Sequence, residues 1–169
     1  MKLHRLQTVQ RLPIAMDEAW AFFSSPKNLS LITPSSLDFQ MTNEVPEVMH
    51  TGTIITYTIR PLLGLKVRWA TEITHADAPH LFVDEQRFGP YRFWHHQHHF
   101  RAIDGGTEVE DLVYYALPFG PLGSLAHALW VRRQLEEIFA FRREALEVRF
   151  GVWESVERGG KRERENGGL

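Results

Sequence analysis

Apolar and polar residues alternate along much of the chain, in short runs that are separated by turn residues. The first run extends from Leu3 to Leu12 and ends at Pro13, which cannot donate a hydrogen bond to a sheet. Further alternating runs follow in the middle of the chain, and the tight turns between them indicate an antiparallel meander. These strands are expected over Leu37–Thr42, Thr53–Arg60, Leu65–His75, Leu81–Phe88, Phe93–Ile103 and Glu108–Leu117.

Helical spacing replaces the alternation in three places. Asp17 is a candidate N-cap for a helix that begins at Glu18, and Lys27–Ile32 indicates a second short helical turn. Near the C-terminus, apolar residues recur at helical spacing and predict one helix from about Leu122 to Phe150. At 1.5 Å per residue this helix would be about 43 Å long, enough to cross a small sheet. The residues expected to pack it against the sheet are Leu125, Leu129, Ile138 and Phe139.

The order of these elements predicts an α+β fold with a curved antiparallel sheet of about seven strands. A strongly bent sheet has one concave face, and the long C-terminal helix is the element available to cover it. One helix cannot fill a wide concave face, so we expect a cavity between the sheet and the helix. Residues 1–150 would form this one domain, and the charged, glycine-rich residues 151–169 would form a disordered tail.

Composition narrows the class of protein without naming a function. The 169 residues are 43% hydrophobic and 24% charged, as in ordinary globular proteins. A net charge of −2 gives no broad electrostatic reason to bind nucleic acid or an anionic membrane. The chain has no cysteine, which excludes disulfides and thiolate metal sites. No stretch resembles a secretory signal or approaches the roughly 20 apolar residues of a membrane span, so we expect a cytoplasmic protein.

Aromatic residues leave two alternatives open. They make up 12% of the chain, which suits either a solid core or a cavity lined with rings. Trp20, Trp69 and Trp130 are expected to be core rings. The apolar turn Pro61–Leu65 could pack on a neighbouring element or form a gate at the mouth of a cavity.

A pair of histidines shares one face of the strand Phe93–Ile103. Alternation places Trp94, His96, His98 and Phe100 together on this face, and the other face carries mainly polar residues. We therefore expect the face with the aromatic rings to be the concave one.

Turn lengths predict which residues lie beside these histidines. A three-residue turn at Gly89–Tyr91 places Asp84 directly opposite His96 on the preceding strand. A two-residue loop at Gly105–Gly106 places Tyr115 opposite His96 on the following strand. The candidate ligand-binding residues on the resulting concave face are Phe82, Asp84, Gln86, Trp94, His96, His98, Phe100, Asp111 and Tyr115.

The presence of polar groups on this concave face requires an explanation, because burying them costs several kcal/mol unless they pair. They could form a self-satisfied network, with Asp84 holding His96 and Asp111 reaching toward His98. They could instead orient the polar end of an apolar ligand. They could perform acid–base catalysis, for which His96, His98, Asp84 and Asp111 are the candidate residues. The fourth alternative is a metal site on His96, His98 and a carboxylate, although we expect neither a metal nor a cofactor.

The pairing of Asp84 with His96 is the sharpest of these predictions. If the carboxylate accepts a hydrogen bond from the imidazole, it fixes the imidazole tautomer and leaves the other ring nitrogen free for ligand or water.

Several short motifs make nearly the whole chain, Lys2 to Phe150, resemble a known superfamily. They are Asn28-Leu29 with Ile32-Thr33-Pro34, Phe82-x-Asp84-x-Gln86, Gly89-Pro90-Tyr91, Trp94-x-His96-x-His98-x-Phe100, Asp111-x-Val113-x-Tyr115 and Pro118-x-Gly120. In this order they resemble the START-like, or Bet v 1-like (SRPBCC), superfamily, and within it bacterial ligand-binding domains related to polyketide cyclase/dehydrase proteins.

This resemblance implies a helix-grip fold that binds a small hydrophobic or amphipathic molecule in its internal cavity. The alternative that it implies is a cyclase/dehydratase-type enzyme with a His/Asp acid–base set in the same cavity. The chain contains no GxGxxG motif, so we expect no dinucleotide.

Overall fold

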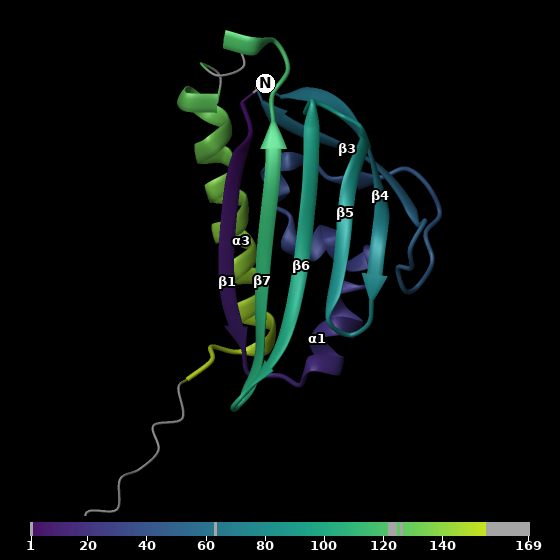
Figure 1. The fold of residues 1–169 in the computed structure, drawn as a ribbon, viewed down its shortest axis with the longest axis vertical. Helices are drawn as coiled ribbons and strands as arrows, with labels where there is room; N and C mark the ends of the chain where they lie inside the picture. The colour runs from purple at the N-terminus through teal and green to yellow at the C-terminus, as the bar shows by residue number, and fades with distance from the viewer. Residues whose placement is uncertain (1, 63, 122–124, 126, 155–169) are drawn as a thin grey trace, which may run out of the picture.

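A seven-stranded antiparallel sheet forms most of the protein, and the strand order is β1-β7-β6-β5-β4-β3-β2 (Figure 1). The computed structural model describes residues 2–62, 64–121, 125 and 127–154. The strands are β1 (His4–Leu12), β2 (Gln40–Met41), β3 (Ile54–Leu62), β4 (Leu65–Asp77), β5 (Leu81–Phe88), β6 (Phe93–Ile103) and β7 (Gly106–Ala116). The predicted strand Leu37–Thr42 is reduced to the two residues of β2.

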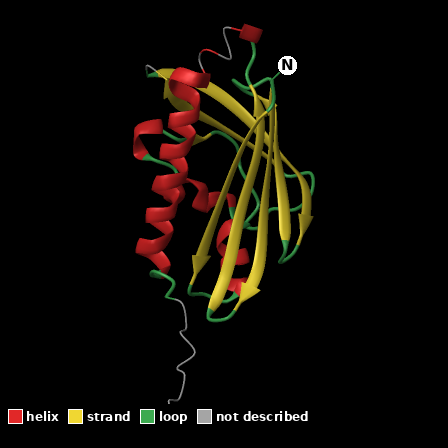
Figure 2. Cartoon of the chain, turned by 60° about the vertical axis from the view of Figure 1, so that its left-hand side comes forward, coloured by secondary structure: helices red, strands yellow, loops and turns green. Residues whose placement is uncertain are grey.

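One long helix and several short helical turns cover the sheet. After β1 come α1 (Met16–Phe23) and the 3-10 turns η1 (Pro26–Ile32) and η2 (Ser35–Leu37). After β7 come a π-helical turn, η3 (His127–Val131), and the long helix α3 (Arg132–Phe150). Figure 2 shows α3 along one side of the sheet, with the short helices closing the lower end of the space between them. This arrangement confirms the predicted α+β helix-grip fold.

The core lies between the sheet and the helices. A larger group of buried side chains joins α1 to the sheet through Phe22, Phe23, Phe82 and Phe100. A smaller group joins α3 to β7 through its buried members, which are Val113, Tyr115, Leu135 and Phe139. The cavity described below is lined by residues of both groups.

The first helix does not start as predicted. It begins at Met16, its N-cap is Ala15, and no side chain caps it, so the prediction that Asp17 is the N-cap is wrong. Asp17 and Glu18 instead lie in the first turn, where a carboxylate is favoured by the positive end of the helix dipole.

The long helix is confirmed over Arg132–Phe150, but its N-terminal part differs from the prediction. The expected start at Leu122 lies outside the described residues. Leu125 and Leu129 were expected to pack against the sheet and are 57% and 53% exposed. A π-helical turn lies at this point, and its wider turn breaks the 3.6-residue spacing on which the prediction rests. Trp130, expected in the core, is 54% exposed as well.

The register between β6 and β7 differs from the prediction by two residues. The hairpin loop is Asp104–Gly105, not Gly105–Gly106, and Ile103 pairs with Gly106. Gly105 takes a φ of 79°, which glycine adopts without strain. Because the shift is even, every side chain keeps its predicted face, but His96 lies opposite Val113 and not opposite Tyr115.

Position 106, at the start of β7, has no room for a side chain. A Cβ atom at this position would lie 2.0 Å from the backbone oxygen of Leu12, at the point where β1 ends. The register between β5 and β6 follows the prediction, with Asp84 opposite His96.

The predicted tail 151–169 falls mostly outside the described residues. Within 151–154, the ring of Trp153 lies under the guanidinium of Arg11, at 5.0 Å. None of the described helices is both long and apolar enough to cross a membrane.

Candidate functional site

A cavity of about 460 Å³ lies between the concave face of the sheet and α3. Strands β3 to β6, the turn η1, the chain after β7 and the inner face of α3 all contribute to its wall. Most of the wall is aliphatic or aromatic, and its polar groups come mainly from β5, β6 and α3. The cavity that the sheet curvature predicts is therefore present.

Aromatic rings form one continuous wall of this cavity. Trp69 stacks on Tyr57 at 5.8 Å and meets Trp94 edge-on at 5.4 Å. Tyr91 lies 5.5 Å from Trp69 and 4.9 Å from Trp94. Burial raises the pKa of Tyr57 and of Tyr91, so both hydroxyls stay protonated and can donate hydrogen bonds. This wall offers flat apolar surfaces with neutral polar edges.

Two buried donors beside the cavity have no hydrogen-bond partner among the described residues. They are the indole Nε1 of Trp69 and the guanidinium Nε of Arg142. Both residues line the cavity. A buried donor without an acceptor is unfavourable by about 1–3 kcal/mol, so these atoms are suited to an acceptor oxygen that enters the cavity.

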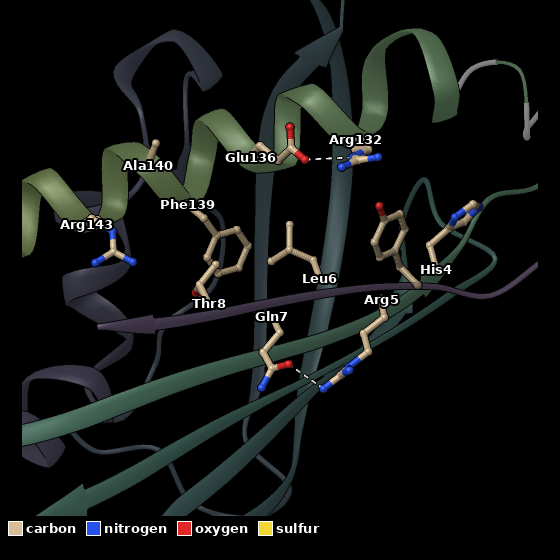
Figure 3. A pocket seen from close by; sticks show the side chains of 11 residues that line it. His4, Arg5, Leu6, Gln7, Thr8, Arg132, Glu136, Phe139, Ala140 and Arg143 are labelled. Atoms are coloured by element: carbon tan, nitrogen blue, oxygen red, sulfur yellow. Dashed lines mark hydrogen bonds and ion pairs between the residues drawn. The ribbon is translucent and has the colours of Figure 1, made fainter. Parts of the chain in front are cut away.

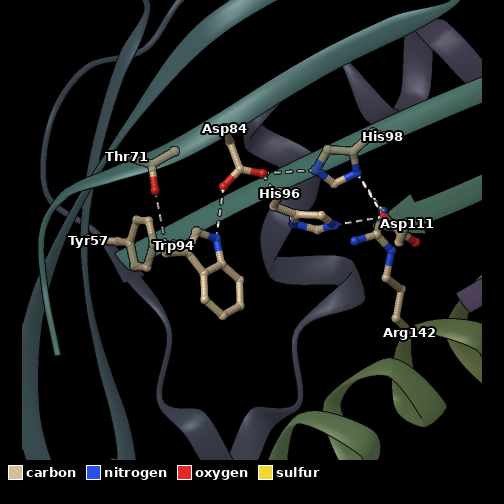
Figure 4. Close-up of polar contacts among 8 residues, drawn as sticks. All are labelled: Tyr57, Thr71, Asp84, Trp94, His96, His98, Asp111 and Arg142. Carbon is tan, nitrogen blue, oxygen red and sulfur yellow. Dashed lines mark hydrogen bonds and ion pairs between the residues drawn. The ribbon is translucent and has the colours of Figure 1, made fainter. Parts of the chain in front are cut away.

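A buried group of five side chains lies at one end of the wall, and we call it the His–Asp cluster: Asp84, His96, His98, Asp111 and Arg142 (Figure 4). Asp84 Oδ2 lies 3.2 Å from His96 Nδ1 and 2.9 Å from His98 Nε2. Asp111 Oδ1 lies 3.0 Å from His96 Nε2 and 2.8 Å from His98 Nδ1. The two imidazoles are therefore held between two carboxylates.

The outer ends of the cluster are also fixed. Arg142 reaches from α3 and places its guanidinium 3.2 Å from Asp111 Oδ1. On the other side, Trp94 Nε1 donates to Asp84 Oδ1 at 3.3 Å. The side chains of Asp111 and Arg142 are only 8% and 11% exposed, so their interaction takes place largely out of water.

Local structure explains why these residues meet. The β5–β6 register sets Asp84 opposite His96, and the β6–β7 register sets His98 opposite Asp111. Helical spacing brings Arg142 to the same place, because it follows the buried Phe139 by three residues.

Burial and neighbouring charges shift the pKa values of the two carboxyl groups in opposite directions. Burial alone would raise the pKa of Asp84, but His96 and His98 lower it well below its usual range. Burial would likewise raise the pKa of Asp111, but Arg142 and the imidazoles lower it. Both carboxylates are therefore ionised at neutral pH.

The pKa values of the two imidazoles shift in opposite directions. Burial lowers the pKa of His96, but the neighbouring carboxylates, Asp84 foremost, outweigh burial and raise it. Burial and the charge of His96 lower the pKa of His98, against the opposing effect of the carboxylates. The pair therefore takes up its first proton at His96 and resists a second one.

One detail of the predicted pairing is wrong. The second ring nitrogen of His96 was expected to be free for ligand or water, but His96 Nε2 contacts Asp111. Both nitrogens of His98 contact carboxylates as well. The predicted contact between Asp111 and His98 is present, but the two residues lie directly opposite each other and not diagonally, because of the register shift. Asp111 also contacts His96, which alternation alone did not predict.

The predicted ligand-binding residues divide into two sets. Those that line the cavity are Phe82, Asp84, Trp94, His96 and His98. Those that do not line it are Gln86, Phe100, Asp111 and Tyr115.

Each residue of the second set has another structural place. Gln86 holds the β5–β6 turn by donating to the backbone oxygen of Tyr91 at 2.7 Å. Phe100 packs in the core, 5.3 Å from Phe23. Asp111 lies behind the two imidazoles, and Tyr115 stacks on His4 at 5.4 Å.

Sequence reasoning missed several cavity residues, which are Tyr57, Trp69, Tyr91 and Arg142. A signal for Arg142 existed, because it falls at helical spacing between Phe139 and Leu146 on the apolar face of α3. An arginine on such a face needs a buried partner, and Asp111 provides it.

The apolar turn between β3 and β4 is attached to α3. Pro61 lines the cavity, and the side-chain amide of Gln134 donates to its backbone oxygen. Leu65 is 65% exposed. The turn is thus held at the cavity wall, and a gating role for it stays a prediction.

A second, more open depression of about 600 Å³ lies between β1 and α3 (Figure 3). Polar and charged side chains surround much of it, including Arg5, Arg143 and the ion pair of Arg132 with Glu136 at 2.9 Å. We call it the β1–α3 groove. Its exposed charges make it less suited to an apolar molecule than the internal cavity.

Solved structures with the same fold are numerous, although they share little sequence with this chain. TTHA0849 from Thermus thermophilus is 19% identical with a TM-score of 0.65, over 87% of this chain and 97% of that one. Major latex-like protein 151 from Panax ginseng is 12% identical with a TM-score of 0.64, over 88% and 97%. Ara h 8.0201 is 14% identical with a TM-score of 0.60, over 87% and 99%.

These likenesses establish the fold alone, a curved antiparallel sheet with a long C-terminal helix in the helix-grip arrangement. No family model matches the sequence, and no curated protein matches it significantly. The narrower resemblance to polyketide cyclase/dehydrase-related domains therefore stays a prediction from the sequence.

Proposed function

We propose that the protein binds one small, largely apolar molecule in the cavity between the sheet and α3. The observation that carries this proposal is the cavity itself, about 460 Å³ in volume, with aromatic and aliphatic side chains over most of its wall. Cavities of this size and character are typical of sites for small organic ligands.

The polar groups of the cavity wall indicate which functional groups the ligand has. The unpaired donors on Trp69 and Arg142 favour a ligand with at least one acceptor oxygen, such as a carbonyl, ether or carboxylate group. The stacked rings of Tyr57 and Trp69 favour a flat or chain-like apolar body. We therefore expect an amphipathic ligand with its oxygen-bearing end toward the donors.

Acid–base catalysis is the alternative function, and the cluster geometry favours it less. A general base needs a lone pair within reach of the substrate proton. Each nitrogen of His96 and His98 already contacts Asp84 or Asp111. Catalysis would first have to break one of these contacts, whereas ligand binding leaves them intact.

A fluorescence titration with 1-anilinonaphthalene-8-sulfonate tests the proposal, because this probe combines an apolar ring system with acceptor oxygens. Ile138→Trp fills the cavity from α3, since Ile138 lines it. Ala140→Trp is the control: it introduces the same side chain on the same helix, but Ala140 lines the β1–α3 groove and not the cavity.

We expect the wild-type protein and Ala140→Trp to bind the probe equally, and Ile138→Trp to bind it at least ten-fold more weakly. Equal binding by the wild type and Ile138→Trp, with loss in Ala140→Trp, would move the binding site to the groove. No binding by the folded wild-type protein would contradict the proposal.

A further inference from the structure

We propose that Asp84, His96 and His98 bind one divalent transition-metal ion in the wall of the cavity. One donor atom from each of these residues lies within 4.8 Å of the other two. This inference goes beyond the proposed function and reverses the expectation from the sequence, because the metal site would form whether or not an organic molecule occupies the cavity.

The spacing of the donor atoms fits a metal ion. Asp84 Oδ2 lies 3.2 Å from His96 Nδ1 and 2.9 Å from His98 Nε2. With metal–nitrogen and metal–oxygen bonds of about 2.0–2.1 Å, two ligand atoms of a tetrahedral ion lie about 3.3 Å apart. The two oxygen–nitrogen distances would need to lengthen by only a few tenths of an ångström.

The groups behind the donors have the arrangement of an outer coordination shell. Histidine ligands almost always donate their second ring N–H to a carboxylate or carbonyl group. Here both second nitrogens, His96 Nε2 and His98 Nδ1, point at Asp111 Oδ1, at 3.0 and 2.8 Å. Arg142 in turn holds Asp111 at 3.2 Å.

One close contact in the cluster is unfavourable when His96 is neutral. A neutral imidazole carries one N–H, and the hydrogen bond of His96 Nε2 to Asp111 uses it. The lone pair of His96 Nδ1 then faces the ionised oxygen of Asp84 at 3.2 Å. His98 Nε2 forms a hydrogen bond with the same Asp84 oxygen at 2.9 Å, and a metal ion at this point would displace that proton and bond all three atoms.

Charge and access agree with this assignment. With both imidazoles neutral, as metal ligation requires, two carboxylates and one guanidinium leave the cluster with one net negative charge in a buried place, which favours a cation. Asp84, His96 and His98 line the cavity, so an ion bound to them would keep a coordination position open toward it. Two imidazoles and one carboxylate suit zinc, iron(II) or cobalt(II), whereas magnesium prefers oxygen ligands alone.

Cobalt(II) and zinc(II) are suitable probes, with magnesium(II) as the counter-probe. The protein is first treated with EDTA and freed of it, and its fold is checked by circular dichroism. Visible absorption then reports cobalt(II) coordination, and calorimetry reports the zinc(II) affinity and stoichiometry. We expect one zinc or cobalt ion per chain and no comparable binding of magnesium.

Variants identify the residues that bind. Asp111→Asn should weaken zinc binding by about 10–100-fold, because it disturbs both imidazoles from behind. Asp84→Asn and His96→Gln should weaken it at least as much. His95→Gln is the matched control: His95 lies on the same strand but on the opposite face, paired with Glu85 at 2.8 Å, and its loss should leave the affinity unchanged.

A measurement on the wild-type protein alone covers the case in which a variant does not fold. Nitrogen-15 NMR of the histidine rings should show zinc-dependent shifts at His96 Nδ1 and His98 Nε2. No stoichiometric zinc or cobalt binding by the folded wild-type protein would overturn the proposal, as would binding lost in His95→Gln and kept in His96→Gln. When the probe titration of the cavity is carried out with EDTA present, failure of the metal site is distinguishable from failure of the proposed function.

Discussion

Replacement of Arg142 by methionine isolates the most buried charge interaction between α3 and the sheet. Arg142 lies 3.2 Å from Asp111, and its guanidinium also lies 5.1 Å from the ring of Phe23 and 5.8 Å from that of Phe139. Methionine keeps an unbranched apolar stem for these rings and removes only the charge and its hydrogen bonds. The variant therefore measures what the ion pair contributes, with little change in packing.

The magnitude follows from what the change leaves behind. Removing one partner of a buried ion pair typically costs about 3–5 kcal/mol, because the other charge stays buried without it. Asp111 keeps its contacts with His96 and His98, and the unpaired Nε of Arg142 disappears with the arginine. We therefore expect Arg142→Met to lower the free energy of unfolding by about 3 kcal/mol, the low end of this range. In a protein of this length that is roughly a 6–12 °C fall in Tm, at 2–4 °C per kcal/mol.

Urea denaturation in EDTA provides the assay, with Arg143→Met as the matched control. Arg143 is the exposed neighbour on the same helix and donates to the backbone oxygen of Val9, so its loss should change the free energy of unfolding by no more than about 0.5 kcal/mol. In the double variant Arg142→Met/Asp111→Asn the stranded charge is gone, and the two changes should couple by about 0.5–3 kcal/mol. Equal effects of Arg142→Met and Arg143→Met, or strict additivity in the double variant, would refute the reasoning.

Two further predictions concern the frame that holds the cavity. Gly106→Ala should destabilise the protein by at least 1–3 kcal/mol, because the new Cβ would lie 2.0 Å from the backbone oxygen of Leu12; a free energy of unfolding within 0.5 kcal/mol of wild type would contradict this close approach. Leu135→Ala, at a residue 4% exposed, should cost about 2–5 kcal/mol, whereas Leu125→Ala, at a residue 57% exposed, should cost less than about 0.5 kcal/mol. Similar losses in the two leucine variants would mean that the helical stripe continues through the π-helical turn after all.

The parts of the site that follow from strand alternation and from one turn were predictable from the sequence. Asp84 lies opposite His96, as alternation on both strands and a three-residue turn predict, although the β5–β6 pairing itself ends at Glu85 and His95. The β6–β7 hairpin was harder, because Asp104, Gly105 and Gly106 offer two loops of equal length. The choice between them depends on the close approach of β1 to Gly106, which is a tertiary contact.

The charged contact that α3 makes in the site was not predicted, for two physical reasons. Arg142 lies on the apolar face of the helix, where its charge gives no hydrophobic signal and its partner is distant in the sequence. The π-helical turn at His127–Val131 changes which residues face the sheet, and simple 3.6-residue spacing cannot anticipate it. Hydrophobic periodicity thus located the helix but not the polar contact that it makes.

Methyl NMR of isoleucine side chains tests the central claim, an apolar cavity that takes up a small molecule, most directly. Isoleucines occur both in the cavity wall and away from it, so one spectrum contains its own control. Those that line the cavity are Ile32, Ile55, Ile59, Ile73 and Ile138, and those that do not are Ile14, Ile54 and Ile103.

The spectrum is recorded during titration with 1-anilinonaphthalene-8-sulfonate, whose ring currents shift nearby methyl signals. Saturable shifts and intermolecular nuclear Overhauser effects at the methyl groups of the cavity wall, with Ile54 and Ile103 unmoved, are the result that we predict. Unchanged signals at Ile55, Ile59 and Ile73 at saturating probe, or shifts confined to Ile54 and Ile103, would contradict binding in this cavity.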